Sequence, residues 1–144
     1  MSNNKPICNT SPNGTKHWLL NGKRHREDGP AVEYANGDKM WFANDRPHRE
    51  DSPAFEWANG DKEWWLNGKR HREDGPAVEH ANGAKEWWLN DKYHREDGPA
   101  VEHANGAKEW FLNDKKAAAI EVFKQANDEQ RKHMLCFYAK EFCS

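Results

Sequence analysis

The chain has 144 residues, of which 32% are charged and 35% hydrophobic, and its formal net charge is -2. The small hydrophobic share is offset by 8 tryptophans, because a few large aromatic side chains bury as much area as many small ones. Disordered chains are poor in aromatic residues, so we expect one folded unit. The slightly negative charge excludes general polyanion binding, and nucleic acid is not an expected partner.

Residues 1–12 form a polar leader without the apolar run of a secretory signal. No stretch of the chain approaches the roughly 18 apolar residues that a membrane span needs. The cysteines are Cys8, Cys136 and Cys143, at irregular spacing. An odd number without a framework favours free thiols in a reducing compartment, so we expect a cytoplasmic protein. A disulfide between Cys8 and a C-terminal cysteine is the alternative.

Residues 13–116 form an internal repeat with a period of 23 residues. The first full unit reads HREDGPAVEYANGDKMWFANDRP, and the same His-Arg-Glu-Asp run begins at His25, His48, His71 and His94. The phase can be followed back to Asn13, so the array holds about four and a half units. Copies at a fixed period predict stacked, equivalent structural elements.

Each unit carries two hairpin signals. Asn36-Gly37 lies between AVEYA and DKMWFA, and an Asn-Gly pair between alternating residues indicates a tight hairpin because both residues tolerate positive φ. Asn44-Asp45 is a second turn candidate, and Glu-Asp-Gly-Pro breaks the chain again. We therefore expect a mainly β fold, an antiparallel β-hairpin repeat array of three short strands per unit.

Two-residue turns would fix the register and hence the two sheet faces. Val32 would then lie opposite Trp41, and Trp41 opposite His48, on the side that forms the core. The other face would pair carboxylates such as Glu56 and Glu63 directly, and would carry an exposed row of aromatic rings. We call Phe42, Trp65, Trp88 and Phe111 the aromatic row.

Residues 117–144 change character, since they lack Gly and Pro and are rich in helix formers. Ile120 and Phe123, and then Met134, Phe137 and Tyr138, recur at helical spacing. Asn127 or Asp128 could cap a second helix, so both one long helix and two short ones fit. We expect a C-terminal α-helical cap over the last strand, with a dimerisation helix as the rival.

The 23-residue hairpin unit, with Gly22-Lys23-Arg24-His25 and an aromatic strand, resembles the MORN repeat over residues 13–116. That family has a G-x-x-H element and stacks hairpins into an elongated meander sheet. The resemblance implies scaffolding, protein contact and sometimes phosphoinositide binding, without catalysis. This chain departs from the usual H-G-x-G, because it continues as His25-Arg26-Glu27-Asp28-Gly29-Pro30, an HRxxGPA variant of viral and bacterial type.

The repeated His-Arg-Glu-Asp run has the residue types of an acid–base site. An enzyme site normally occurs once, however, so four equivalent copies predict a structural role in which Arg pairs with Glu and Asp organises the turn. One His per unit supplies no complete metal ligand set, even with the additional His80 and His103. We expect no enzyme, no metal site and no cofactor.

The sequence therefore predicts a non-enzymatic protein-binding repeat module with an acidic and aromatic sheet face. Its partner would be a protein with a basic surface, and the chain could be a phage-encoded inhibitor of a bacterial defence or host protein. The alternatives are a membrane-surface module that reads phosphoinositides, a structural scaffold, and a homodimer formed through the C-terminal helix. The predicted site comprises the aromatic row with Glu33, Glu56, Glu63, Glu79, Glu86, Glu102 and Glu109.

Overall fold

The computed structural model describes residues 4–142, which divide after His71 into two compact units. Residues 1–3 of the predicted leader and residues 143–144 of the predicted C-terminal segment lie outside the described residues. The predicted free thiol of Cys143 is therefore also outside them. Cys8 and Cys136 are free and exposed. Among residues 4–142, no helix is both long and apolar enough to cross a lipid bilayer.

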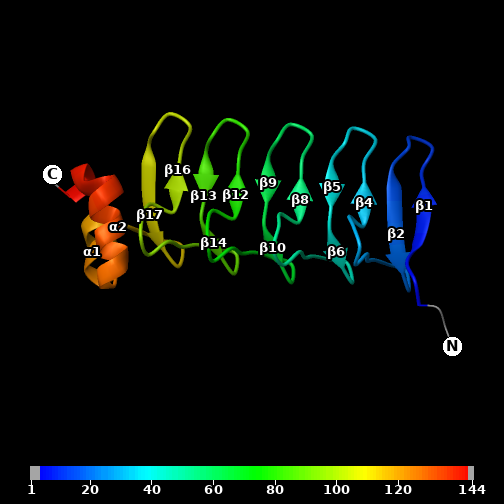
Figure 1. The fold of residues 1–144 in the computed structure, drawn as a ribbon, viewed down its shortest axis with the longest axis horizontal. Coiled ribbons are helices and arrows are strands. Elements are labelled where there is room, and N and C mark those ends of the chain that lie inside the picture. Colours follow the sequence, from blue (N-terminus) through cyan, green and yellow to red (C-terminus); the bar gives the residue numbers. More distant parts are fainter. Residues whose placement is uncertain (1–3, 143–144) are drawn as a thin grey trace. The chain divides into compact units, whose positions relative to one another are not determined.

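The first unit is an antiparallel meander with short hairpins attached to it (Figure 1). Its sheet strands follow the order β1-β2-β4-β5-β8-β9, with β3 paired to β2, while β6-β7 and β10-β11 form separate two-stranded ribbons. The strands are β1 (Ile7–Thr10), β2 (Lys16–Leu20), β3 (Lys23–Arg24), β4 (Val32–Glu33), β5 (Lys39–Met40), β6 (Phe42–Ala43), β7 (Arg46–Pro47), β8 (Phe55–Glu56), β9 (Lys62–Glu63), β10 (Trp65–Leu66) and β11 (Lys69–Arg70). The polar leader thus contributes β1, in which Cys8 lies opposite Trp18 of β2.

The second unit repeats this pattern and adds helices. Its sheet strands follow the order β12-β13-β16-β17-β18, and β14-β15 form a separate ribbon. The elements are β12 (Val78–Glu79), β13 (Lys85–Glu86), β14 (Trp88–Leu89), β15 (Lys92–Tyr93), β16 (Val101–Glu102), β17 (Lys108–Leu112), β18 (Lys115–Ala117), α1 (Ala119–Gln125), α2 (Asp128–Tyr138) and the 3-10 helix η1 (Ala139–Phe142). The predicted fold class, a mainly β antiparallel meander with C-terminal helices, is confirmed.

The second hairpin turn of each 23-residue repeat has the predicted two-residue form. Asn44 and Asp45 have φ values of 50° and 65°, the left-handed conformation that such a turn requires. The backbone N–H of His48 donates to the Trp41 carbonyl at 3.2 Å, so these two residues lie opposite each other as expected.

The first hairpin loop is one residue longer than predicted. The N–H of Tyr34 donates to the Asp38 carbonyl at 2.9 Å and closes a loop over residues 35–37, in which Gly37 has a φ of 101°. Val32 therefore lies opposite Met40 rather than Trp41. A three-residue loop with glycine in the left-handed position is the next commonest hairpin connection, and it shifts the register by one. Our assignment of Val32 and Trp41 to one face was wrong.

The corrected register turns the expected carboxylate pairs into opposite-charge pairs. Glu33 lies opposite Lys16 on one side and Lys39 on the other. Glu56 lies opposite Lys39 and Lys62, not opposite Glu63. The second unit continues the alternation, because Glu102 is flanked by Lys85 and Lys108. Opposite charges in facing positions stabilise an antiparallel sheet, so the recurring lysines have a structural explanation.

The core of the first unit lies on the Val32 side of the sheet. Ala31, Val32 and Phe42 are buried there, and Met40 and Phe55 pack against them. Phe42 is only 5% exposed, so the expectation that it belongs to an exposed aromatic row is wrong. The cause is the register shift, which brings Phe42 to the face that carries Val32.

The tail forms two short helices that cover the last repeat. The Asn127 side chain accepts a hydrogen bond from the N–H of Gln130 at 2.9 Å and begins α2, as one of the two predicted caps. Val122 of α1 and Met134 of α2 are buried in a cluster with Trp110 of β17. The predicted C-terminal cap is therefore confirmed.

Candidate protein-binding surfaces

Three of the arginines of the His-Arg-Glu-Asp runs, Arg26, Arg49 and Arg95, lie over the ring of a tryptophan in the same unit. The guanidinium carbon is 4.0 Å from the ring centre of Trp18 for Arg26, and 3.8 Å from that of Trp87 for Arg95. Arg49 stacks on Trp41 in the same way, at 3.9 Å. Cation–π stacking of this kind fixes both side chains.

The same arginines are held by acceptors on their own loop and on the neighbouring strand. Arg26 donates to the Pro30 carbonyl at 3.2 Å and forms an ion pair with Glu33 at 3.4 Å. Equivalent pairs join Arg49 to Glu56, Arg72 to Glu79 and Arg95 to Glu102. We predicted that Arg pairs with Glu across the strand, as Arg72 with Glu63, but each arginine instead pairs with the glutamate seven residues later. These pairs account for four of the predicted site carboxylates: Glu33, Glu56, Glu79 and Glu102.

The glycine of the Asp-Gly-Pro turn makes room for this arginine. A Cβ atom at Gly29 would lie 2.8 Å from the guanidinium carbon of Arg26, closer than a real contact allows. Arg26 can therefore reach Asp28, at 2.9 Å, and its hydrogen bond and charge hold the pKa of that carboxyl below its usual value. The second repeat has Ser52 in place of the glycine.

The histidine of the run joins each repeat to the next turn. His25 Nδ1 accepts the N–H of Asn44 at 3.2 Å, and His48 Nδ1 accepts that of Asn67 at 3.1 Å. In the second unit, His94 Nδ1 accepts the N–H of Asn113 at 3.1 Å. Each histidine thus satisfies a turn donor, which agrees with a structural role for the repeated run.

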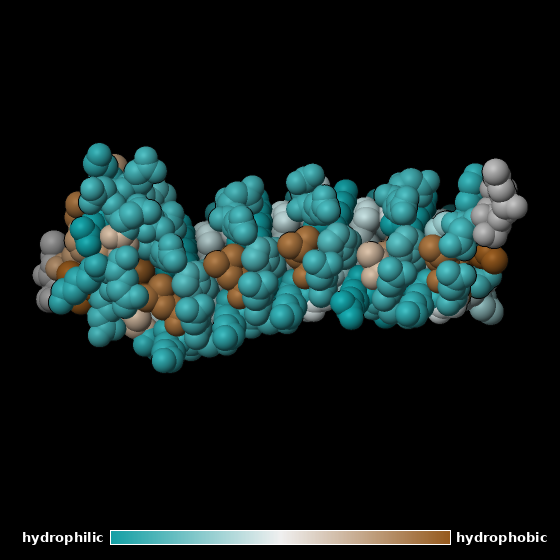
Figure 2. Space-filling model, turned by 90° about the horizontal axis from the view of Figure 1, so that it is seen from below, coloured by the Kyte–Doolittle hydropathy of each residue, from teal (hydrophilic) through white to brown (hydrophobic). Residues whose placement is uncertain are grey.

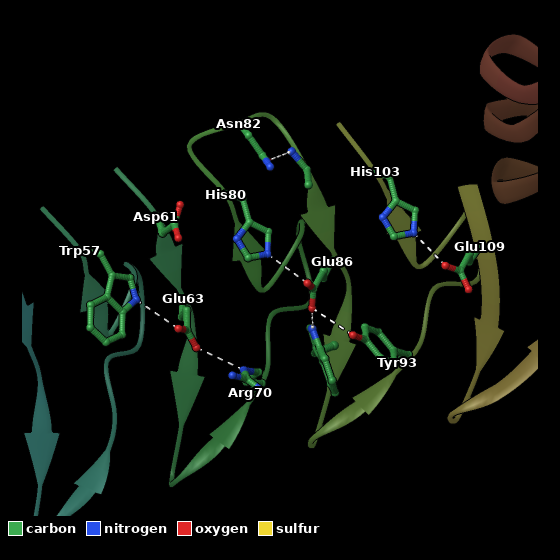
Figure 3. Close-up of polar contacts among 12 residues, drawn as sticks. Trp57, Asp61, Glu63, Arg70, His80, Asn82, Glu86, Tyr93, His103 and Glu109 are labelled. Carbon is green, nitrogen blue, oxygen red and sulfur yellow. Dashed lines mark hydrogen bonds and ion pairs between the residues drawn. The ribbon is translucent and has the colours of Figure 1, made fainter. Parts of the chain in front are cut away.

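The remaining residues of the aromatic row, Trp65, Trp88 and Phe111, are half-buried. In the first unit, Glu63 lies opposite Phe55 and shares its face of the sheet, and in the second unit, Glu86 and Glu109 lie opposite Val101 in the same way. In the first unit, Glu63 accepts a hydrogen bond from Trp57 Nε1 at 3.1 Å (Figure 3). It accepts a second bond from Trp65 Nε1 at 3.0 Å. Arg70 donates a third bond to it, at 3.2 Å. The carboxylate of Glu63 therefore already accepts three hydrogen bonds from side chains of the first unit.

In the second unit, the carboxylates of Glu86 and Glu109 also form hydrogen bonds with side chains of that unit. His80 and His103 take the place that Trp57 has in the first unit. Glu86 is bonded to His80 at 3.0 Å, Trp88 Nε1 at 2.9 Å and the Tyr93 hydroxyl at 3.2 Å (Figure 3). Glu109 is bonded to His103 at 2.8 Å and Lys116 at 3.1 Å, and these bonds lower its pKa. The two extra histidines therefore orient carboxylates.

The predicted site residues are consequently divided between the two faces of the sheet. In the first unit, Trp65 lies with Glu63 on the Val32 side, and in the second unit, Trp88 and Phe111 lie with Glu86 and Glu109 on the Val101 side. Polar side chains of the same unit bind these carboxylates. Glu33, Glu56, Glu79 and Glu102 lie with the arginines and the other tryptophans on the opposite side. The predicted site residues therefore lie on both faces of the sheet.

In each unit, the face that carries the arginine-stacked tryptophans has clefts, which we call the tryptophan clefts. Cleft 1 has a volume of about 420 Å³ and is lined by Asn4, Lys5, Pro6, Trp18, Leu20, His25, Arg26, Glu27 and Asp28. Cleft 2, of about 570 Å³, is lined by His25, Arg26, Glu27, Trp41, Phe42, Ala43, His48, Arg49, Glu50, Asp51 and Ser52. Cleft 3, in the second unit, has about 590 Å³ and is lined by Arg72, Glu73, Asp74, Gly75, Pro76, Trp87, Leu89, His94, Arg95, Glu96, Asp97, Gln130 and His133.

Each cleft combines an apolar floor with an acidic rim. A tryptophan and the residue two positions later, Leu20, Ala43 or Leu89, both line each cleft, and we call them its floor. Separately, Figure 2 shows hydrophobic patches that recur between hydrophilic side chains within each unit. The arginines in the walls are already paired, and Lys5 also lines cleft 1. Glu27 and Glu50 approach Nε2 of His25 and His48 at 3.8 and 4.0 Å, but their side chains are 92% and 79% exposed. The clefts therefore keep a negative rim.

Sequence reasoning missed these clefts because it assigned the Glu-Asp pair to the turn alone. The signal was present as one glutamate directly after each arginine, at positions 27, 50, 73 and 96, beside a tryptophan at the same place in each unit. Among residues 4–142, no group of three or more His, Cys, Asp or Glu side chains is placed to hold a metal ion.

No protein-family model matches this chain, and a search of curated proteins also found no match. The assignment of a long antiparallel meander of repeating hairpins therefore depends on the structure alone. The finer assignment to the MORN family remains a prediction.

Proposed function

We propose that this chain is a non-enzymatic protein-binding repeat module for a partner with a basic surface. The observation that carries the proposal is the repetition of the tryptophan clefts, each with an aromatic and aliphatic floor and an exposed glutamate at the rim. Aromatic residues in a concave surface serve as anchors for a partner, and surrounding carboxylates accelerate encounter with a basic one. Repetition of the cleft favours an extended contact over a single small ligand.

We assign partner contact to the tryptophan clefts rather than to the aromatic row. Phe42 is buried, and Glu63 and Glu86 each accept three hydrogen bonds from their own unit. A partner's cation would have to displace these donors, whereas Glu27 and Glu50 project into solvent. A role for the aromatic row in rigidifying the repeat suits these contacts better.

The MORN-like repeat pattern supports the same functional class, because that family provides scaffolds and protein contacts. A small array of this kind suits an inhibitor that covers a functional surface of a larger protein, and the HRxxGPA variant suggests a phage-encoded inhibitor of a bacterial protein. Phosphoinositide binding has less support, since Lys39, Lys62 and Lys108 lie opposite glutamates in the sheet.

The proposal is tested by capture from bacterial extract with the full chain as bait. The test bait carries Glu27→Gln and Glu50→Gln, and the matched control carries Asp128→Asn and Glu129→Gln, which remove the same charge from the exposed start of α2. We expect a retained protein with a basic surface that the control holds and the cleft variant releases. Equal retention by both variants would show that the clefts do not bind the partner.

A further inference from the structure

The two tryptophan clefts of the first unit are immediate neighbours. His25, Arg26 and Glu27 line both of them, so one loop forms the ridge between cleft 1 and cleft 2. A continuous partner segment that crosses this ridge can place one side chain in each cleft. Glu27, 92% exposed at the top of the ridge, lies within reach of both side chains.

The distance between the two clefts follows from the sheet. Trp18 belongs to β2 and Trp41 directly follows β5, and β2 pairs with β4, which pairs with β5. Neighbouring strands are about 4.8 Å apart, so two steps separate the equivalent tryptophans by about 9.6 Å. A partner segment that runs across the strands must therefore present equivalent side chains at this interval.

A polyproline II helix has this interval. It rises about 3.1 Å per residue with three residues per turn, so every third side chain lies on the same face about 9.3 Å further along. A β-strand rises about 3.3 Å per residue but alternates its faces, so residues three apart point in opposite directions. An α-helix returns to the same face after seven residues and about 10.5 Å, which overshoots the cleft interval.

The chemistry of the clefts suits the same ligand. Proline rings pack well on aromatic side chains, and Pro-rich segments in the polyproline II conformation dock in aromatic-lined grooves. Trp18 and Trp41 are half-buried, each with one face against an arginine, and the remaining ring surface lies beside Leu20 or Ala43. The exposed carboxylates of Glu27 and Glu50 favour a cationic side chain at the rim.

We propose that clefts 1 and 2 bind a basic, proline-rich segment of the partner in the polyproline II conformation, with equivalent side chains at every third position. This inference rests on the proposed function and specifies the conformation and composition of the partner. A preformed polyproline II segment loses little conformational entropy on binding, which makes it a better ligand than a flexible segment of equal charge.

The test uses labelled synthetic peptides and fluorescence anisotropy with the full chain. The first peptide has four copies of Arg-Pro-Pro, the second has four copies of Arg-Gly-Ser, and the third has four copies of Arg-Pro-Pro-Pro, so that charge is constant while stiffness or spacing changes. A fourth peptide places four arginines on one face of an Ala-rich helix. We expect the first peptide to bind at least about tenfold more tightly than the other three.

The binding site is checked with the same matched variants. Glu27→Gln with Glu50→Gln should weaken binding of the Arg-Pro-Pro peptide at least about fivefold at low salt, while Asp128→Asn with Glu129→Gln should leave it unchanged. Circular dichroism confirms that both variants fold. Equal loss in both variants would place the peptide outside the clefts and overturn the inference.

The peptide comparison separates this inference from the proposed function. If the Arg-Gly-Ser peptide or the helix binds as tightly as Arg-Pro-Pro, and does so in the clefts, a basic partner is supported and the polyproline II conformation is refuted. If none of the peptides binds, the inference fails, and the proposed function is then judged by capture of a partner from extract.

Discussion

The Nδ1 atom of His48 accepts a hydrogen bond from the backbone N–H of Asn67, 19 residues further along the chain. The contact joins the start of a 23-residue repeat to the second hairpin turn of the same repeat. His25 and His94 make the same contact with Asn44 and Asn113. The histidine of the repeated run therefore makes a recurring structural hydrogen bond to a turn.

Replacement of this histidine should destabilise the repeat. We expect His48→Ala to lower the free energy of unfolding by about 1–2 kcal/mol, because the turn N–H loses its acceptor. His103→Ala, which removes only an exposed pair with Glu109, should cost less than about 1 kcal/mol. Urea denaturation followed by tryptophan fluorescence measures both. Equal effects would show that the turn contact is not what the recurring histidine supplies.

The glycine of the Asp-Gly-Pro turn should affect stability mainly through the ion pair between the arginine and the aspartate of the same loop. A Cβ at position 98 would approach the guanidinium carbon of Arg95 to 2.7 Å, but the equivalent Arg49 still stacks on Trp41 at 3.9 Å in the repeat that carries Ser52. Gly98→Ala should therefore shift Arg95 away from Asp97 rather than from Trp87, and should cost less than about 1 kcal/mol. The matched control is Ser52→Ala, since that repeat already carries a Cβ at the equivalent position. Thermal unfolding should shift for Gly98→Ala and hardly at all for Ser52→Ala.

The hydroxyl of Tyr138 should ionise at unusually high pH. Burial, together with a hydrogen bond of 2.8 Å to Glu102, raises its pKa to about 12, above the ordinary value of 10.0. Its neutral form is favoured in the folded state, so the contribution to stability is complete below pH 10 and is lost as the pH rises through about 12.

Two measurements check this behaviour of Tyr138. A spectrophotometric titration of tyrosinate absorbance should lose its latest-ionising component in Tyr138→Phe. The folded wild-type protein should also lose stability more steeply than Tyr138→Phe in the alkaline range. A titration in which the variant matches the wild type would mean that the hydroxyl is not held as the contact with Glu102 implies.

The cap should depend on the side chain of Met134. This residue is 0% exposed and packs in the cluster with Trp110, so Met134→Ala should lower the free energy of unfolding by about 2–5 kcal/mol. Leu135→Ala serves as the control, because Leu135 is 51% exposed and its loss should change stability by less than about 0.5 kcal/mol. Chemical denaturation distinguishes the two, and comparable losses would contradict the packing of α2 on the last repeat.

The repeat period, the strand content and the helical tail could be predicted from sequence because each depends on local signals. Asn44-Asp45 allowed only a tight turn, and the Asn127 cap began a helix where two candidates were adjacent. The free energy of these features is dominated by neighbouring residues, so a single sequence carries enough information.

The faces of the sheet could not be predicted in the same way. Asn36-Gly37 fits the centre of a two-residue turn and equally the end of a three-residue loop, and the choice depends on how Val32 and Met40 pack. A shift of one residue exchanges the two faces, so the predicted site combined Phe42 with Glu33, which lie on opposite sides. The tryptophan clefts were missed because the Glu-Asp pair was assigned to the turn alone, while a cleft such as cleft 2 takes side chains from two successive repeats.

The shared wall between clefts 1 and 2 bears on how such a chain can evolve. Because Glu27 and its loop serve the cleft on either side, an in-frame duplication of one 23-residue segment adds a complete binding position without new side chains at a junction. Each duplication lengthens the tract of partner that can be engaged, and avidity rises with every added position. Affinity can therefore be adjusted by unequal recombination between copies, in whole steps, before any point mutation is selected.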